Sequence, residues 1–199
     1  MSKPSSNSLR RASGVTGPAV FTAAWIISSL RQTGHGTVSI QISGLAAPDA
    51  RDPWIMMTGF LVLGGCLVIF GQELAGELGG AAPRLIQGAG VLAIAAGLLR
   101  RDHMELTAGP VSWHNDAHNI VSLILYADMV LPQFLLARCL RGAWRRYLLV
   151  SAIATVAVLA AFIPDTSSPA AGILQRVAVT IPLLALAAIA ALYTRVGCT

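Results

Sequence analysis

Six apolar stretches, each close to the length that a helix needs to cross a lipid bilayer, constrain this chain more than any other feature of its sequence. Only 12% of its 199 residues are charged, whereas 55% are apolar, and a soluble protein of this size would carry more surface charge. The sequence therefore predicts an all-α integral membrane protein with a six-transmembrane-helix bundle. The expected spans are residues 18–31, 53–72, 84–100, 117–137, 147–163 and 171–193.

The first 17 residues differ from the rest of the chain. They are polar, rich in serine and basic, and they contain no apolar core of their own. We expect a disordered basic cytoplasmic leader at 1–17, followed by one transmembrane domain at 18–199. The first apolar run could act as an uncleaved signal, but no cleavable signal peptide is expected.

The positions of Lys and Arg predict the orientation of the bundle. With both termini in the cytoplasm, nine of the fourteen basic residues fall inside and five outside, as the positive-inside rule requires. Four of the nine are arginines in the short connection at 138–147, beside Trp144 and Tyr147. We expect this connection to lie at headgroup level and to contact anionic lipid. Membrane topology also explains the net charge of +5 better than nucleic-acid binding does.

Three segments carry a resemblance to a known family. They read VSIQISGLAAPDARDPWIMMTGFLVLG, SWHNDAHNIVSLI and GILQRVAV, in that order along the chain. In these segments the sequence resembles the bacterial six-helix membrane family called domain of unknown function 998, over about residues 18–195. The matching positions are Ser43, Leu45, Ala46, Ala47 and Pro48 in the first external loop, His118 at the start of the fourth helix, and Gly172, Gln175 and Arg176 in the sixth. The resemblance implies a multi-pass protein of the bacterial cell membrane, and it implies no reaction. His114 and Asp116 are additions to the family pattern.

Asp128 is the ionisable residue that the membrane environment makes most costly. It lies near the middle of its span, where a charged carboxylate costs about 2.5–3.5 kcal/mol even on the lenient insertion scale. It should therefore face the protein interior. Pro132 has no N–H and leaves the carbonyl of residue 128 without its helical partner, so a local polar site is expected there. The alternative is a structural hydrogen bond from Asp128 to a neighbouring helix.

Further polar residues are expected at the outer end of the bundle. If the fourth helix begins near Ser112, His114 and His118 lie one turn apart on one face. The alternative is an ordinary N-terminal helix turn with Ser112 or Asn115 as its cap. For Arg100, Arg101 and Arg176 the ordinary role is headgroup contact. The candidate catalytic residues are Asp128, His118, His114, Asp116 and Glu105. The candidate substrate-binding residues are Trp113, Asn119, Tyr126, Gln175, Arg176 and Trp54.

These residues favour an intramembrane enzyme. A carboxyl group in apolar surroundings keeps its proton near neutral pH and can donate it to a weak base. A dry, aromatic-lined pocket also stabilises a cationic intermediate. We therefore expect general acid/base chemistry on a lipid-soluble substrate, of the isoprenoid or terpene cyclase or isomerase type. The expected partners are membrane lipid and a hydrophobic small molecule, and neither nucleic acid nor a cofactor is expected.

Three other functions remain open at this stage. A proton-coupled small-molecule transporter would use Asp128 as its titrating group. A zinc-dependent lipid hydrolase would bind its metal through His114, His118 and His103, although no general-base Glu lies between the first two. An accessory subunit would instead bind a larger membrane complex through faces of small residues. The oligomeric state is left open.

Overall fold

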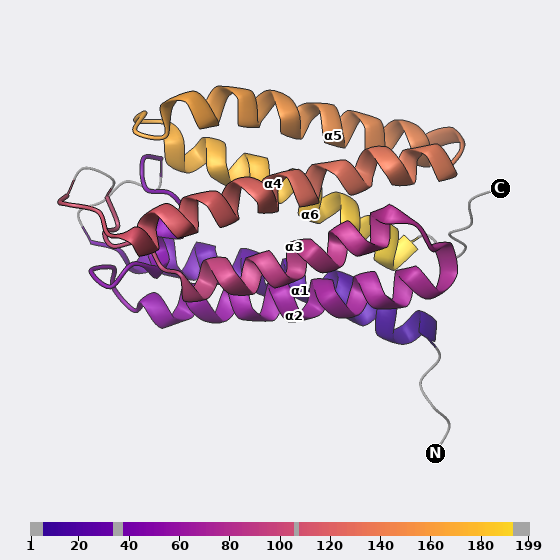
Figure 1. Ribbon diagram of the computed structural model, residues 1–199, viewed down its shortest axis with the longest axis horizontal. Coiled ribbons are helices and arrows are strands. Elements are labelled where there is room, and N and C mark those ends of the chain that lie inside the picture. The colour runs from indigo at the N-terminus through magenta and orange to yellow at the C-terminus, as the bar shows by residue number, and fades with distance from the viewer. Residues whose placement is uncertain (1–5, 34–37, 106–107, 193–199) are drawn as a thin grey trace, which may run out of the picture.

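A computed structural model describes residues 6–33, 38–105 and 108–192 of the chain, and within these ranges every regular element is helical. Each of the six long helices contains a stretch long and apolar enough to cross a membrane, which confirms the expected six-helix bundle (Figure 1). Short 3-10 helices, η1 (Ser43–Ala46) and η2 (Ile163–Asp165), lie in two of the connections. The long helices are α1 (Ser6–Arg31), α2 (Pro53–Leu78), α3 (Ala81–Leu98), α4 (Trp113–Cys139), α5 (Gly142–Phe162) and α6 (Ala171–Leu192).

The six helices form a closed ring. Each packs against the next along the chain, and α6 packs back against α1. The α1–α2, α3–α4 and α5–α6 connections lie together at one end of the bundle, at the left in Figure 1, which we call the loop end. The start of α1 and the end of α6 lie at the opposite end. The two ends of the helical domain thus share one side, and the assignment of that side to the cytoplasm stays a prediction.

The expected disordered leader is wrong from residue 6 onward, because α1 begins at Ser6. Residues 1–5 lie outside the described part of the chain. Tertiary packing explains the difference. A Cβ built at Gly17 would lie 2.7 Å from Cys66 Cβ of α2, and one at Gly14 would overlap Ala190 of α6. These two glycines bring α1 close to both neighbours, so a segment of polar composition is held as helix.

Glycine also sets the shortest turns. Gly79 and Gly80, with φ of 61° and 77°, join α2 to α3, and Gly142, with φ of 62°, begins α5. Residues with a side chain rarely adopt these left-handed conformations. At the start of α4, Ser112 acts as the N-cap and its side chain accepts a hydrogen bond from the His114 N–H at 3.3 Å, as N-cap serines do.

The first loop folds into the bundle instead of lying on its surface. Residues 40–47 are all buried, and α6 holds their backbone. The Ile173 N–H donates to the Val38 carbonyl at 3.0 Å, and the Arg176 guanidinium donates to the Ile40 carbonyl at 2.7 Å. On the other side, a Cβ at Gly44 would overlap the Met104 carbonyl of the α3–α4 connection. We call residues 38–47 the inserted loop.

Helices α2 and α3 approach closely through a pair of glycines. A Cβ built at Gly64 would lie 2.5 Å from the Gly90 carbonyl oxygen, and one at Gly90 would lie 2.6 Å from the Gly64 carbonyl oxygen. Both obstacles are backbone atoms, which cannot rotate away. This reciprocal contact is the small-residue packing that helices use inside membranes.

We predict that Gly64→Ala destabilises the bundle, because the added methyl group must push α3 away. Overpacking of this kind typically costs about 1–3 kcal/mol. Gly65→Ala is the matched control, since a Cβ at Gly65 meets nothing within 4 Å. Melting temperatures of both variants in one detergent test the prediction, and equal values for the two would contradict it.

Candidate functional site

Three adjoining cavities lie at the loop end of the bundle. The polar cavity, of about 230 Å³, includes Arg101, Gln41, Glu105, Ser39 and Thr166 in its lining. The mixed cavity, of about 260 Å³, is lined by Gln41, Ser43, His118, Asn119, Ser122, Leu123, Tyr126, Phe162, Ile163, Thr166 and Gln175. The apolar recess, of about 30 Å³, is lined mainly by Phe21, Ile42, Phe60, Leu63, Leu125, Met129 and Val179.

Shared lining residues connect the three spaces. Gln41 and Thr166 line both the polar and the mixed cavity. Tyr126 and Gln175 line both the mixed cavity and the apolar recess. Together the three spaces form one cleft that runs from a polar mouth to an apolar interior. Its walls come from the inserted loop, from α4 and α6, and from the α3–α4 and α5–α6 connections, and α1 and α2 contribute to the apolar recess.

A chain of hydrogen bonds orients Tyr126 in the middle of this cleft. The Ile42 N–H donates to Gln175 Oε1 at 2.5 Å, and a backbone N–H can only donate, so it fixes the orientation of the Gln175 amide. Gln175 Nε2 then donates to the Tyr126 phenol oxygen at 2.9 Å. Since that oxygen already accepts a hydrogen bond, the Tyr126 O–H remains available to donate to a ligand.

His118 lies on the same side of α4 and is held from α3. It is only 3% exposed, and its Nδ1 lies 2.8 Å from the Leu99 carbonyl oxygen and 3.1 Å from that of Ala96. Carbonyl oxygens only accept hydrogen bonds, so Nδ1 carries the ring proton. In the neutral ring Nε2 is then an acceptor and a base. His118 also satisfies carbonyls at the end of α3 that have no helical partner.

Arg101 brings a buried positive charge to the mouth of the cleft. Its side chain is 2% exposed and donates from Nη1 to Gln41 Oε1 at 3.2 Å. Gln41 Nε2 in turn donates to the Thr166 carbonyl at 2.7 Å. Burial lowers the pKa of Arg101 below its ordinary value, because desolvation disfavours the charged form. The expectation that Arg101 lies among lipid headgroups is therefore wrong.

Arg176 does not line the cleft, and its hydrogen bonds hold other parts of the fold together. It is 7% exposed and donates to the Ile40 carbonyl and to Ser29 Oγ, the latter at 2.9 Å. Its guanidinium also lies 5.3 Å from the centre of the Trp25 ring, within the range of a cation–π interaction. Arg176 thus fastens the inserted loop to α1 and α6.

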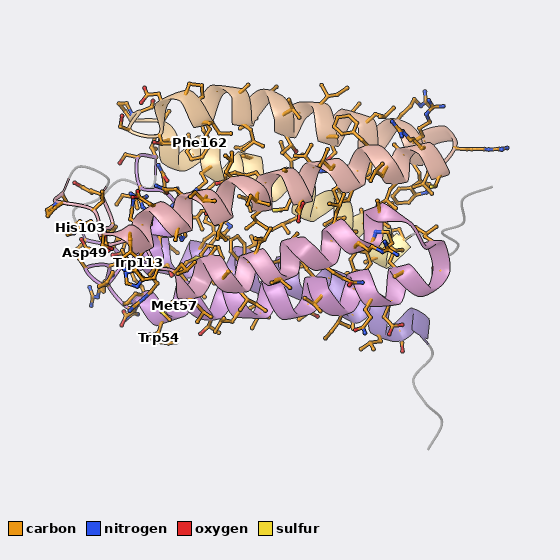
Figure 2. The ribbon with its side chains drawn as sticks, viewed as in Figure 1. Asp49, Trp54, Met57, His103, Trp113 and Phe162 are labelled. Atoms are coloured by element: carbon orange, nitrogen blue, oxygen red, sulfur yellow. The ribbon has the colours of Figure 1, made fainter. Side chains whose placement is uncertain are left out.

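Several of the candidate residues lie outside the cleft. Trp54 and Trp113 are 63% and 67% exposed at the loop end, as Figure 2 shows. His114 and Asp116 are also exposed, and the His114 ring stacks on Trp113 at 3.7 Å between ring centres. Exposed aromatic side chains at this level are typical of a membrane interface. Asn119 lines the mixed cavity, and the exposed Glu105 lines the polar one.

The three histidines proposed for zinc do not share a site. His114 is exposed, whereas the Nδ1 atom of His118 faces two carbonyl groups. His103 Nδ1 lies 3.6 Å from Asp49 Oδ2 instead, and Figure 2 shows the two residues together at the loop end. Among the described residues no group of three His, Cys, Asp or Glu side chains could hold a metal ion.

Asp128 lies on another face of α4 from Tyr126. A Cβ built at Gly88 would lie 2.6 Å from Asp128 Oδ2, so the carboxyl group packs against α3. It is partly buried and lines none of the cavities considered above. Its proposed role as a catalytic acid stays a prediction.

We predict that Asp128→Asn and Asp128→Leu both fold with melting temperatures no lower than that of the unmodified protein. Both substitutions keep the branching of the side chain beside Gly88, and both remove an ionisable group from a membrane span. If Asp128 instead binds a neighbouring helix through a hydrogen bond, Asp128→Leu should lose about 0.6–2 kcal/mol of stability. Thermal unfolding in a single detergent distinguishes the two roles.

Asp102 links the two ends of the α3–α4 connection by hydrogen bonds to Ser112. Its carboxylate accepts hydrogen bonds from the Ser112 N–H at 2.5 Å and from the Ser112 hydroxyl at 2.8 Å. These hydrogen bonds hold the pKa of Asp102 below its ordinary value, because they stabilise the charged form. The carboxylate and the N-cap serine therefore fix the start of α4 together.

We predict that Asp102→Ala lowers the melting temperature at neutral pH and that the difference disappears in acid. A depressed pKa stabilises the folded state above the unfolded pKa of about 3.9, and this contribution is lost as the pH falls through the lower folded pKa. Melting curves of both proteins at several pH values test this. A difference that grows as the pH falls would contradict it.

Comparisons with known proteins identify the family of the chain. No curated protein and no solved structure matches it. The model of one family, described as "Protein of unknown function (DUF998)", matches residues 15–192. This match covers all six helices apart from the first turns of α1, and it confirms the resemblance seen in the loop and helix motifs. The chain therefore belongs to the family called domain of unknown function 998.

Proposed function

We propose that the protein binds an elongated, lipid-soluble molecule in the cleft and acts on it as an intramembrane enzyme by proton transfer. The observation that carries this proposal is the hydrogen-bond chain from Ile42 through Gln175 to Tyr126. It holds a phenol group, with its proton available, where the mixed cavity meets the apolar recess. Ligand sites in proteins have this character, with apolar walls and a few oriented polar groups.

The polar groups of α4 suit acid and base roles. His118, Ser122 and Tyr126 follow one another at four-residue intervals and all line the mixed cavity, so they lie along one side of the helix. His118 Nε2 can accept a proton, and the Tyr126 O–H can donate a hydrogen bond to a ligand oxygen. The outer two residues are about 12 Å apart along the helix, with the Ser122 hydroxyl between them. A substrate that reaches all three groups must be elongated.

This arrangement favours an isomerase over a cyclase. A cyclase that begins by protonating an alkene needs a strong acid, and among the described residues no buried carboxyl group lines the cleft. An isomerase acting on an unsaturated lipid carbonyl compound instead needs a base, which takes a proton from a carbon next to the carbonyl group and returns it to another carbon, and an oriented donor, which stabilises the negative charge that the electron pair places on the carbonyl oxygen. His118 and Tyr126 supply these two functions.

The other three candidate functions have less support from the structure than the isomerase. The zinc-dependent hydrolase lacks a ligand cluster among the described residues. No observation specifically favours a proton-coupled transporter or an accessory subunit. We place the protein in a bacterial plasma membrane with the cleft on the outer side, because nine of the fourteen Lys and Arg residues then lie on the cytoplasmic side.

We predict that Tyr126→Phe loses most of a lipid that co-purifies with the unmodified protein. The variant keeps the ring but removes the O–H donor, and a typical net hydrogen bond of 0.5–1.5 kcal/mol corresponds to about a two- to tenfold loss of affinity. Tyr147→Phe is the matched control, because Tyr147 is exposed in the first turns of α5, at the opposite end of the bundle. Mass spectrometry of extracted lipids gives the measurement, and equal lipid content in all three proteins would exclude Tyr126 as the donor.

The enzymatic step has its own test. In deuterated water, an isomerase that moves a proton should place deuterium on a carbon atom of the bound lipid. His118→Gln should bind the lipid and leave it unlabelled, because Gln can still donate to the carbonyls of Ala96 and Leu99 but is not a base. A bound lipid that stays unlabelled in the unmodified protein would mean binding without proton transfer.

A further inference from the structure

The polar cavity is lined by a buried cation, Arg101, that no carboxylate among the described residues contacts directly. Arg101 is 2% exposed, and the described residues accept a single hydrogen bond from it, the one from Nη1 to Gln41. Its Nε–H is buried and has no acceptor in this part of the chain. A guanidinium group has five N–H donors arranged in a planar fork, so the single hydrogen bond to Gln41 leaves donors of Arg101 without an acceptor among the described residues.

No carboxylate among the described residues lies within ion-pair distance of Arg101. Asp49 is near enough to interact electrostatically, but its carboxylate accepts a hydrogen bond from the Met104 N–H at 2.8 Å and pairs with His103. Glu105 lines the same cavity and is exposed. A buried charge is unfavourable unless an opposite charge and hydrogen bonds accompany it. An anion in the polar cavity would supply both.

The rest of the cleft indicates what kind of molecule carries this anion. Gln41, which binds Arg101, also lines the mixed cavity, so an anion at Arg101 lies at the head of a passage that ends in the apolar recess. That recess measures about 30 Å³, and a space this small suits the end of one hydrocarbon chain better than the two chains of a phospholipid.

We propose that Arg101 binds the anionic head group, a phosphate or a carboxylate, of a single-chain lipid whose chain extends through the mixed cavity toward the apolar recess. This inference rests on the proposed function, because it names the substrate class of the same cleft. The planar guanidinium fork matches both head groups, since each presents two oxygens in one plane. The hydroxyl groups of Ser39 and Ser168 line the same cavity and add to its polar character.

Three compounds with one chain and different head groups test the assignment: dodecyl phosphate, dodecanoate and dodecanol. Each is titrated into the purified protein in a neutral maltoside detergent, and its affinity is measured by native mass spectrometry. We expect the two anions to bind at least tenfold more tightly than the alcohol. Arg101→Gln should remove this preference, and Arg100→Gln, which changes the adjacent half-buried arginine, should keep it.

Inorganic phosphate distinguishes a lipid head group from a free anion. If the chain contributes to binding, inorganic phosphate at the same concentration should not displace dodecyl phosphate. Equal affinity for the two phosphates would overturn the assignment to a lipid. If Arg101→Gln does not fold, the comparison of head groups in the unmodified protein decides alone, because equal affinities for all three compounds overturn the proposal.

The failure of this inference can be told apart from the failure of the proposed function. If the three compounds bind equally and Tyr126→Phe weakens all of them, the cleft is a lipid site but Arg101 does not select the head group. If none of the three binds to the unmodified protein, both the head-group assignment and the lipid site are overturned.

Discussion

The structure depends on hydrogen bonds to the buried backbone N–H and carbonyl groups of the inserted loop. Residues 40–47 have no helical hydrogen-bonding pattern beyond the short η1 turn, yet they are buried in a membrane protein. Irregular backbone that is buried away from water is tolerated only where the protein itself supplies hydrogen-bond partners. Gln175 and Arg176 of α6 supply them, through the Ile42 N–H and the Ile40 carbonyl. The three cavities exist because this loop stays inside the bundle and forms one of their walls.

The same contacts give the cleft its polarity. Gln175 could not orient the Tyr126 phenol if its own amide were free to rotate, and the loop backbone prevents that rotation. His118 is oriented in a comparable way by carbonyls at the end of α3. Both side chains are held by main-chain atoms of other elements, so they are positioned before any ligand arrives. Preorganisation of this kind is what a binding or catalytic site requires.

Sequence alone predicts the architecture well and the site less well. Six apolar stretches of bilayer length leave few alternatives to a six-helix bundle, and the motifs around Ser43, His118 and Gln175 identify the family. The sequence-based expectations are wrong where the burial of a side chain depends on residues far away along the chain. Nothing in the local pattern near Arg101 distinguishes a buried guanidinium from one among lipid headgroups, because its burial depends on Gln41 and the inserted loop, sixty residues earlier. In the same way, helical spacing predicts that His114 and His118 share a face, but not that only His118 is covered by α3.

The hydrogen bonds from Gln175 and Arg176 to the inserted loop also limit which insertions and deletions the chain can tolerate. Each residue inserted or deleted within α6 ahead of Ile173 turns the following part of the helix by about 100° relative to the residues before it. Such a change would separate Ile173, Gln175 and Arg176 from their backbone partners at the same time, since all three hydrogen bonds span the same two segments. Insertions and deletions should therefore be poorly tolerated between Ala171 and Arg176, because any shift there misaligns all three hydrogen bonds together.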